Sequence, residues 1–311
     1  MKNSINKNLL SLMVAVLLPL SSLGVEYVRG DVNRNRTVDV SDVTYLISKV
    51  LTSGGAYIPI CDVNFDRATN VADVTELIHY VLSGVWISPY PYTSYPENAQ
   101  VFTVNGVSFA MIPVEGGTFD FVPYEPHATG REVTVDDFLI GQTEVTQALW
   151  VAVMGENPSI FTGDLLPVNN ISYRDCEDFI AKLNELTGMD FSFPTDKQWQ
   201  FAALGANLSH GYLYSGSDNI DEVAWYNDNH NLDDAYPVAL KLPNELGLYD
   251  MSGNVNEFMY CPNAFDLTKS AIGLGGSTFS DRIYCTVYSF GSDWPNNVSP
   301  VYGLRLAIWH Q

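Results

Sequence analysis

The sequence predicts an α+β protein in two unlike parts, a small all-helical repeat pair followed by a larger domain with irregular connections. A segment of helical periodicity occurs twice, at Gly30–Leu51 and Cys61–Leu82, with a constant offset of 31 residues. From Val101 onward, short strand-like runs alternate with a few helical segments and long loops. At 311 residues the chain is long enough for two such domains.

The first residues have the composition of a secretory signal. Lys2 and Lys7 precede the apolar run Leu9–Leu20, and small residues lead up to Gly24. This order predicts a signal peptide over residues 1–24, with cleavage after Gly24 and export of the rest of the chain. The apolar run is too short for a transmembrane helix, so we expect a secreted or surface-associated protein without a transmembrane anchor.

The chain is strongly acidic, with a formal net charge of −21 at pH 7. Nucleic acids carry phosphates that require a basic surface, so we expect no nucleic-acid partner. Clustered carboxylate and carbonyl oxygens are instead the ligands that Ca²⁺ prefers.

Each repeat begins with a twelve-residue loop that has oxygen-bearing side chains at positions 1, 3, 5, 9 and 12. Position 7 offers a backbone carbonyl. Because a loop that curls around one ion points alternate residues inward, this spacing predicts a calcium site in each copy. The predicted ligands are Asp31, Asn33, Asn35, Thr37, Asp39 and Asp42 in the first loop, and Asp62, Asn64, Asp66, Ala68, Asn70 and Asp73 in the second.

Each loop runs into a helix, no helix precedes it, and position 12 is Asp rather than Glu. In these features residues 28–84 resemble a dockerin, the duplicated F-hand module of secreted bacterial proteins. The resemblance implies calcium-ordered helices that dock onto a cohesin module of another protein. Position 6, usually glycine, is Arg36 or Arg67, and a left-handed arginine costs about 1 kcal/mol. The alternative is a degenerate repeat that folds without metal.

A linker and a large domain follow the repeats. Residues 85–100 contain prolines, serines and aromatic residues without periodicity, which predicts the linker. In the large domain, residues 101–311, Thr195 and Gln198 have the spacing of a helix capping box. Further helices are expected after Glu144 and after Ser172, and strands are expected over residues 102–107, 109–114, 117–121 and 131–140.

Eight short motifs occur in the large domain. They are Met111–Gly117, Gly141–Thr146, Gly155–Ser159, Pro194–Trp199, Tyr214–Ser217, Gly247–Glu257, Gly275–Ser277 and Gly303–Arg305. In these motifs the domain resembles the formylglycine-generating enzyme family, also called the sulfatase-modifying-factor family. The resemblance implies a C-type-lectin-like fold with little regular structure. It also implies a calcium site made by the side chains of Asp250 and Glu257 and the carbonyls of Gly253 and Val255.

The founding enzymes of this family oxidise a sulfatase cysteine to formylglycine, using O₂ and a Cu(I) ion held by two cysteine thiolates. The corresponding positions in this sequence are Ser280 and Cys285. A serine hydroxyl is a hard, weakly acidic donor and does not replace a thiolate as a ligand for Cu(I). We therefore expect neither copper binding nor catalysis by Cys285. A copper-dependent formylglycine-generating oxidase is the alternative function.

The competing function is that of a binding module. Some bacterial members of the family vary the residues between a Gly-Gly-Ser motif and a terminal Gly-Leu-Arg motif, and both motifs are present here. Tyrosine, tryptophan and asparagine between them suit an adaptable binding surface. We predict that the domain binds an extracellular ligand or protein through Tyr284, Tyr288, Phe290, Asp293, Trp294, Asn296, Asn297 and Tyr302. The alternative is a loop whose aromatic residues pack on the core.

Overall fold

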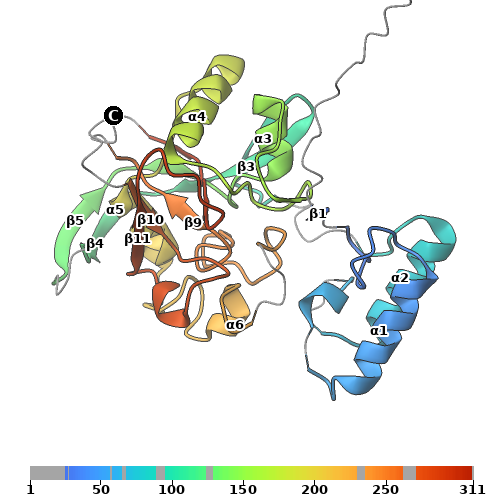
Figure 1. Cartoon of the computed structure of the whole chain (residues 1–311). Helices are drawn as coiled ribbons and strands as arrows, with labels where there is room; N and C mark the ends of the chain where they lie inside the picture. The colour runs from blue at the N-terminus through green and yellow to red at the C-terminus, as the bar shows by residue number, and fades with distance from the viewer. Residues whose placement is uncertain are drawn as a thin grey trace, which may run out of the picture.

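The structure is a computed structural model of the chain. It describes residues 25–26, 28–56, 58–64, 68–88, 95–123, 129–229, 235–261 and 271–309. The predicted signal peptide and part of the predicted linker lie outside these residues. Within them the chain is mixed α+β, as predicted, with a helical N-terminal part and a larger part that contains the sheets (Figure 1). No helix in the described ranges is both long and apolar enough to cross a membrane.

Two helices of equal length pack against each other in the N-terminal part. Helix α1 spans Val40–Thr52 and helix α2 spans Val71–Ser83, and the short 3-10 helix η1 (Pro59–Cys61) lies between them in the chain. Leu46 and Leu77, at equivalent positions of the two repeats, are fully buried in the shared core. The helical periodicity of the two repeats is therefore explained by one common apolar interface.

The two ends of this helical part are joined through Glu76. Its carboxylate accepts hydrogen bonds from the backbone N–H groups of Ile87 and Ser88 at 2.7 and 2.8 Å. The Arg29 guanidinium lies 3.4 Å from the same carboxylate and 4.0 Å over the Trp86 ring. These contacts fasten the chain before the first repeat to the chain after the second.

A five-stranded antiparallel sheet with the order β2-β3-β6-β13-β8 forms the base of the larger part. Its strands are β2 (Gln100–Val104), β3 (Val107–Val114), β6 (Phe138–Gly141), β13 (Ala307–Ile308) and β8 (Phe191–Ser192). Strand β13 pairs with β6 on one side and β8 on the other, so Ala307 and Ile308 lie inside the sheet.

A second sheet, with the order β11-β10-β9-β12, holds the C-terminal loop. Its strands are β9 (Asn256–Phe258), β10 (Ala271–Leu274), β11 (Phe290–Asp293) and β12 (Tyr302–Gly303). Two-stranded ribbons are formed by β4 (Gly117–Phe121) with β5 (Arg131–Val135), and by β1 (Val25–Glu26) with β7 (Phe161–Thr162).

The strand expected over residues 131–140 is two strands that belong to different sheets. Strand β5 pairs with β4, whereas β6 pairs with β3. The chain breaks at Asp136 and Asp137, where the Asp137 carboxylate accepts a hydrogen bond from the backbone N–H of Gly116 at 2.7 Å. This long-range bond separates the two pairings, and local sequence periodicity does not report it.

The helices of the larger part include the three that the sequence predicts. They are α3 (Gln147–Met154), α4 (Tyr173–Thr187), α5 (Asp196–Ala203) and α6 (Ile220–Val223), with 3-10 helices η3 (Ala206–Leu208) and η4 (Arg282–Tyr284). Helices α3 and α4 pack together through the rings of Trp150 and Phe179, which stack at 4.7 Å. Cys176 is fully buried on α4, and all four cysteines are unpaired thiols.

Candidate functional site

The two predicted calcium loops repeat their hydrogen bonds as well as their sequence. In the first loop, the Asp42 carboxylate accepts hydrogen bonds from the backbone N–H groups of Asn33 and Asp39 at 3.1 and 3.0 Å. In the second loop, the Asp73 carboxylate accepts the equivalent bonds, at 3.3 and 2.9 Å. Position 12 therefore ties together positions 3 and 9 in both copies.

Both loops bury the carboxylates at positions 1 and 12. Asp31 and Asp62 are each 5% exposed, and Asp42 and Asp73 are fully buried. Burying carboxylates is costly unless a cation compensates them. With the amides of Asn33 and Asn35 in the first loop and of Asn64 in the second, they form sets of hard oxygen donors that fit Ca²⁺.

Two details of the loops differ from an assembled metal site. Among the described residues, no three His, Cys, Asp or Glu side chains are grouped so that they could hold a metal ion. Asp39, at position 9, instead caps helix α1 by accepting the Ser41 N–H at 2.7 Å. Asp66, a predicted ligand of the second loop, lies outside the described residues. Full coordination of each ion therefore stays a prediction.

Arg36 adopts the left-handed conformation that glycine usually supplies at position 6. Its φ is 72°, and its N–H donates to Asp31 Oδ2 at 2.8 Å. The other Asp31 oxygen accepts the N–H of Asn35 at 2.9 Å. The first loop thus closes around Asp31 despite the strain of an arginine in this conformation, which is about 1 kcal/mol. Arg67 lies outside the described residues.

In the larger part, the Gly-Gly-Ser turn and Cys285 are packed into one unit. A Cβ at Gly276, whose φ is 76°, would lie 2.8 Å from Cys285 Sγ, so only glycine fits there. Cys285 is fully buried, and burial, assisted by the charge of Asp281, raises the pKa of its thiol to about 12. Ser280 Oγ accepts the Ser277 N–H at 3.0 Å. A buried, protonated thiol and a hydroxyl engaged in a turn do not fit Cu(I), which requires two thiolates.

A buried cluster of three carboxylates and one arginine lies beneath this turn. Both oxygens of Glu257 accept hydrogen bonds from the Arg305 guanidinium at 2.6–2.9 Å, and Oε2 also accepts the Trp199 indole N–H at 2.6 Å. Glu144, Asp250, Glu257 and Arg305 are each at most 2% exposed. Glu144 is expected from its local sequence to precede a helix, and its place in this cluster depends on contacts with residues more than 100 positions away.

The charges in this cluster are unbalanced. Burial, reinforced by the charges of Asp250 and Glu257, raises the pKa of Glu144 well above its ordinary value. Burial also raises the pKa of Asp250 to about 6. Raised carboxyl pKa values favour the neutral acids in the folded state. The stability that protonated Asp250 contributes is therefore present below pH about 4 and is lost as the pH rises through about 6.

The third predicted calcium site, that of the larger part, lies in the same cluster. Asp250 Oδ2 accepts the Ala239 N–H at 2.7 Å, while Oδ1 is buried with no hydrogen-bond partner. That oxygen is available to a cation, whereas Glu257 is already neutralised by Arg305. Gly253 has a φ of 78°, and the Val255 N–H donates to Glu144 at 3.0 Å. A calcium ion held by their carbonyls and by Asp250 stays a prediction.

The predicted ligand-binding residues include exposed and buried side chains. Tyr284, Phe290 and Trp294 are 54%, 41% and 57% exposed. Tyr302 is only 6% exposed, and its ring stacks on Phe258 at 4.6 Å, so it belongs to the core rather than to the expected surface. The reason is the pairing of β12 with β9, which a local sequence pattern does not reveal.

The other four predicted residues belong to the same segment of the chain. Asn296 and Asn297 are exposed, and Asp293 and Tyr288 are partly buried. The Asp293 carboxylate accepts hydrogen bonds from Asn297 Nδ2 at 2.8 and 2.9 Å and so shapes the turn. Three further apolar side chains of the same segment, not among the predicted residues, are also exposed, and they are Phe279, Ile283 and Val298.

Both parts of the chain match known domain families. The sulfatase-modifying factor enzyme 1-like domain matches residues 97–309, and the dockerin type I domain matches residues 29–82. The chain is similar to the chaperone protein LppX of Paenibacillus barcinonensis, with 32% identity over an alignment of 252 residues that covers 64% of this chain and 89% of that protein.

Solved structures share the fold of the larger part. Treponema denticola variable protein 1 superposes with a TM-score of 0.60 at 24% identity, covering 69% of this chain and 99% of that one. PvdO from Pseudomonas aeruginosa gives 0.55 at 18% identity, covering 68% and 99%. Both resemblances predicted from the sequence motifs are thus confirmed, and the chain belongs to the sulfatase-modifying factor enzyme 1-like family, with a dockerin type I domain ahead of the family domain.

Proposed function

We propose that this chain is an exported, calcium-binding dockerin protein whose large domain binds a ligand or another protein rather than oxidising one. The observation that supports this most strongly is the pair of residues at the family's copper positions. Ser280 offers a hydroxyl, and Cys285 is a fully buried thiol with a raised pKa. The oxidase alternative requires two accessible thiolates there.

In this proposal the dockerin part attaches the chain to another protein. Dockerin domains of this type typically bind calcium and occur in extracellular proteins, which agrees with the predicted signal peptide and with the buried loop carboxylates. A cohesin module of another protein is the partner that we expect for it. Calcium acts here by fixing the loops, and through them the first turns of α1 and α2.

Exposed apolar side chains on the two helices mark the face that we assign to this partner. Three pairs, each offset by one repeat, have nearly equal exposure. They are Val40 and Val71 (66% and 68%), Ile47 and Ile78 (40% and 40%), and Leu51 and Leu82 (78% and 81%). Large exposed apolar groups gathered on one element are typical of protein interfaces. Their duplication in register supports an interface built from both helices.

The double substitution Leu51→Asp and Leu82→Asp is expected to weaken capture of a cohesin module at least tenfold, because two exposed apolar contacts become charged. Both leucines are largely exposed, so folding is retained. Calorimetric titration against a panel of cohesin modules in calcium measures the effect. Leu208→Asp, at a leucine of the larger part that is 59% exposed, is the matched control. Equal affinity of the double variant and the wild type would remove this face from the interface.

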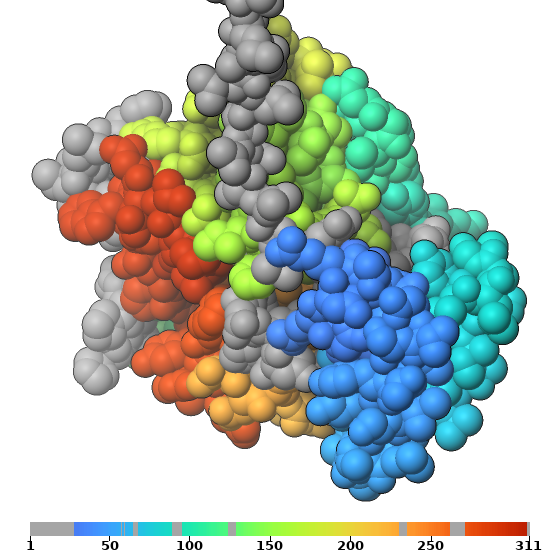
Figure 2. Space-filling view, turned by 45° about the vertical axis from the view of Figure 1, so that its right-hand side comes forward, coloured from blue at the N-terminus to red at the C-terminus, as the bar shows by residue number. Residues whose placement is uncertain are grey.

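The binding surface of the large domain is assigned to its C-terminal segment. Figure 2 shows this segment, coloured red, at the surface of the molecule. Tyr284 and Trp294 are more than half exposed, and Ile283, which precedes Tyr284 in the chain, is 61% exposed. Such side chains provide large contacts at low entropic cost. The similar protein named as a chaperone supports a role in which another protein is bound.

A further inference from the structure

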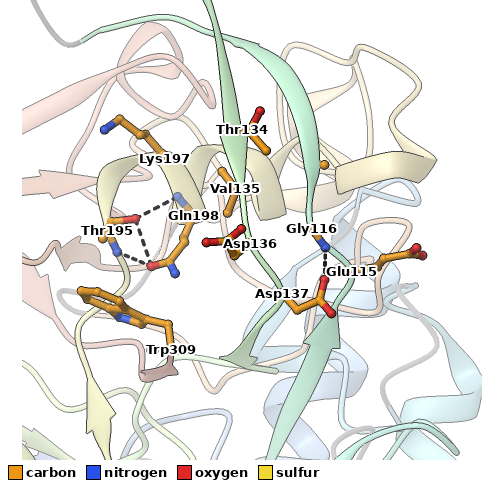
Figure 3. Close-up of a pocket in the computed structure, with 11 residues that line it drawn as sticks. Glu115, Gly116, Thr134, Val135, Asp136, Asp137, Thr195, Lys197, Gln198 and Trp309 are labelled. Atoms are coloured by element: carbon orange, nitrogen blue, oxygen red, sulfur yellow. Dashed lines mark hydrogen bonds between the residues drawn. The ribbon is translucent and has the colours of Figure 1, made fainter. Parts of the chain in front are cut away.

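A cavity of about 860 Å³ opens on the larger part (Figure 3). It lies between the base of the β4–β5 ribbon, the start of helix α5 and Trp309. Its volume is within the range of about 300–1,000 Å³ typical of small-molecule sites. Neither the dockerin part nor the predicted ligand-binding surface contributes a residue to it.

Gln198 points a hydrogen-bond donor into this cavity. The side chain is only 7% exposed, and its Oε1 accepts hydrogen bonds from the Thr195 N–H and hydroxyl at 2.9 and 3.0 Å. Because a backbone N–H can only donate, the oxygen must face Thr195 and the Nε2 group must face away from it. The capping box of α5 therefore fixes the orientation of the amide and presents Nε2 to the cavity (Figure 3).

Asp136 provides an acceptor across from this donor. Its exposed carboxylate points toward Gln198 in Figure 3. The neighbouring Asp137 is held at the rim, since it accepts the Gly116 N–H at 2.7 Å. The break between β5 and β6 places these two aspartates here.

Trp309 forms an apolar wall of the cavity in a fixed orientation. Its indole N–H donates to the carbonyl of Phe193 at 2.9 Å, and its ring meets Tyr260 edge-on at 5.4 Å. A second hollow of about 440 Å³ shares Trp309, Glu115 and Asp137 with the first. Because they share these lining residues, the two hollows adjoin each other and are described together as one groove.

We propose that this groove binds a neutral oligosaccharide. A sugar hydroxyl both donates and accepts, so adjacent hydroxyls match Gln198 Nε2 and the Asp136 carboxylate at the same time. The C–H face of a pyranose suits the electron-rich face of Trp309. Three carboxylates line the groove against one lysine, Lys197, which disfavours an anionic ligand. The inward Nε2 donor disfavours a cation.

Gln198→Glu tests the proposal without disturbing the helix cap, because glutamate serves equally at this capping-box position. It replaces the inward donor with a carboxylate oxygen. Asp136→Asn removes the acceptor charge at an exposed position, and Glu132→Gln, exposed on β5 outside the groove, is the control. Saturation-transfer NMR on the full calcium-loaded chain would use neutral cello-, xylo-, manno- and chito-tetraose, with tetramethylammonium as the cation probe.

We expect at least one neutral tetrasaccharide to bind, with its affinity lowered tenfold or more by Gln198→Glu and by Asp136→Asn and unchanged by Glu132→Gln. Thermal unfolding of each variant checks that it is folded. The proposal is overturned if no neutral saccharide binds or if both groove variants bind as the wild type does. It is also overturned if tetramethylammonium binds in the groove and Gln198→Glu strengthens that binding.

Discussion

Arg305→Met is expected to lower the free energy of unfolding of the large domain by about 3–5 kcal/mol, the cost of leaving a buried charge without its partner. Arg305 is fully buried and donates to both oxygens of Glu257 and to the carbonyl of Gly141. Without it, Glu257 loses the cation that both of its oxygens contact, and Lys241 remains as a described cation whose charge acts on Asp250. Urea denaturation followed by tryptophan fluorescence measures the loss.

Two further variants separate the ion pair from a general effect of removing arginine. Arg305→Lys keeps the charge but not the forked geometry, so a smaller loss is expected. Arg282→Met removes an exposed arginine whose partner, Asp228, is also exposed, and should leave the unfolding midpoint unchanged. If Arg305→Met were as stable as the wild type, the carboxylates would have to be neutralised in some other way, and the description of this cluster would fail.

Removal of calcium is expected to unfold the dockerin part selectively. At a calcium concentration one hundred times the dissociation constant, each site contributes about 2.7 kcal/mol. Chelation leaves the buried carboxylates of Asp31, Asp42, Asp62 and Asp73 uncompensated in a small domain. We expect the thermal transition of this part to shift to lower temperature in EDTA, while the transition of the large domain moves less.

The double variant Asp31→Ala and Asp62→Ala identifies the loops as the source of this effect. It removes position 1 from both copies, so the transition of the dockerin part should no longer respond to calcium. Glu156→Ala, at an exposed acid of the larger part, is the control and should respond as the wild type does. A wild-type transition that is the same with and without calcium would instead favour a repeat that folds without metal.

The features that the sequence predicts well are local ones. The dockerin repeat could be identified because each calcium loop is a short pattern, in which the bond from Asn33 to Asp42 joins residues only nine positions apart. The capping box joins Thr195 and Gln198, which are three positions apart, and the structure contains it. The ordered motifs of the large domain identified the family in the same way.

The features that the sequence does not predict depend on contacts between distant segments. Tyr302 follows a polar loop and is therefore expected at the surface. The pairing of β12 with β9 instead places its ring against Phe258. Glu144 reaches Val255 across more than 100 residues. The groove joins Asp136, Gln198 and Trp309 from three separate segments, so no spacing in the sequence could have indicated it.

The central proposal, a large domain that binds rather than oxidises, is tested most directly by titrating the reduced, calcium-loaded chain with Cu(I) against a chromogenic copper chelator. We predict that the wild type takes up no Cu(I) that depends on Cys285, because Ser280 supplies no second thiolate. Ser280→Cys shows whether the fold can still assemble the metal site when both cysteines are present. Tight one-to-one binding by the wild type that is lost in Cys285→Ser would contradict the proposal.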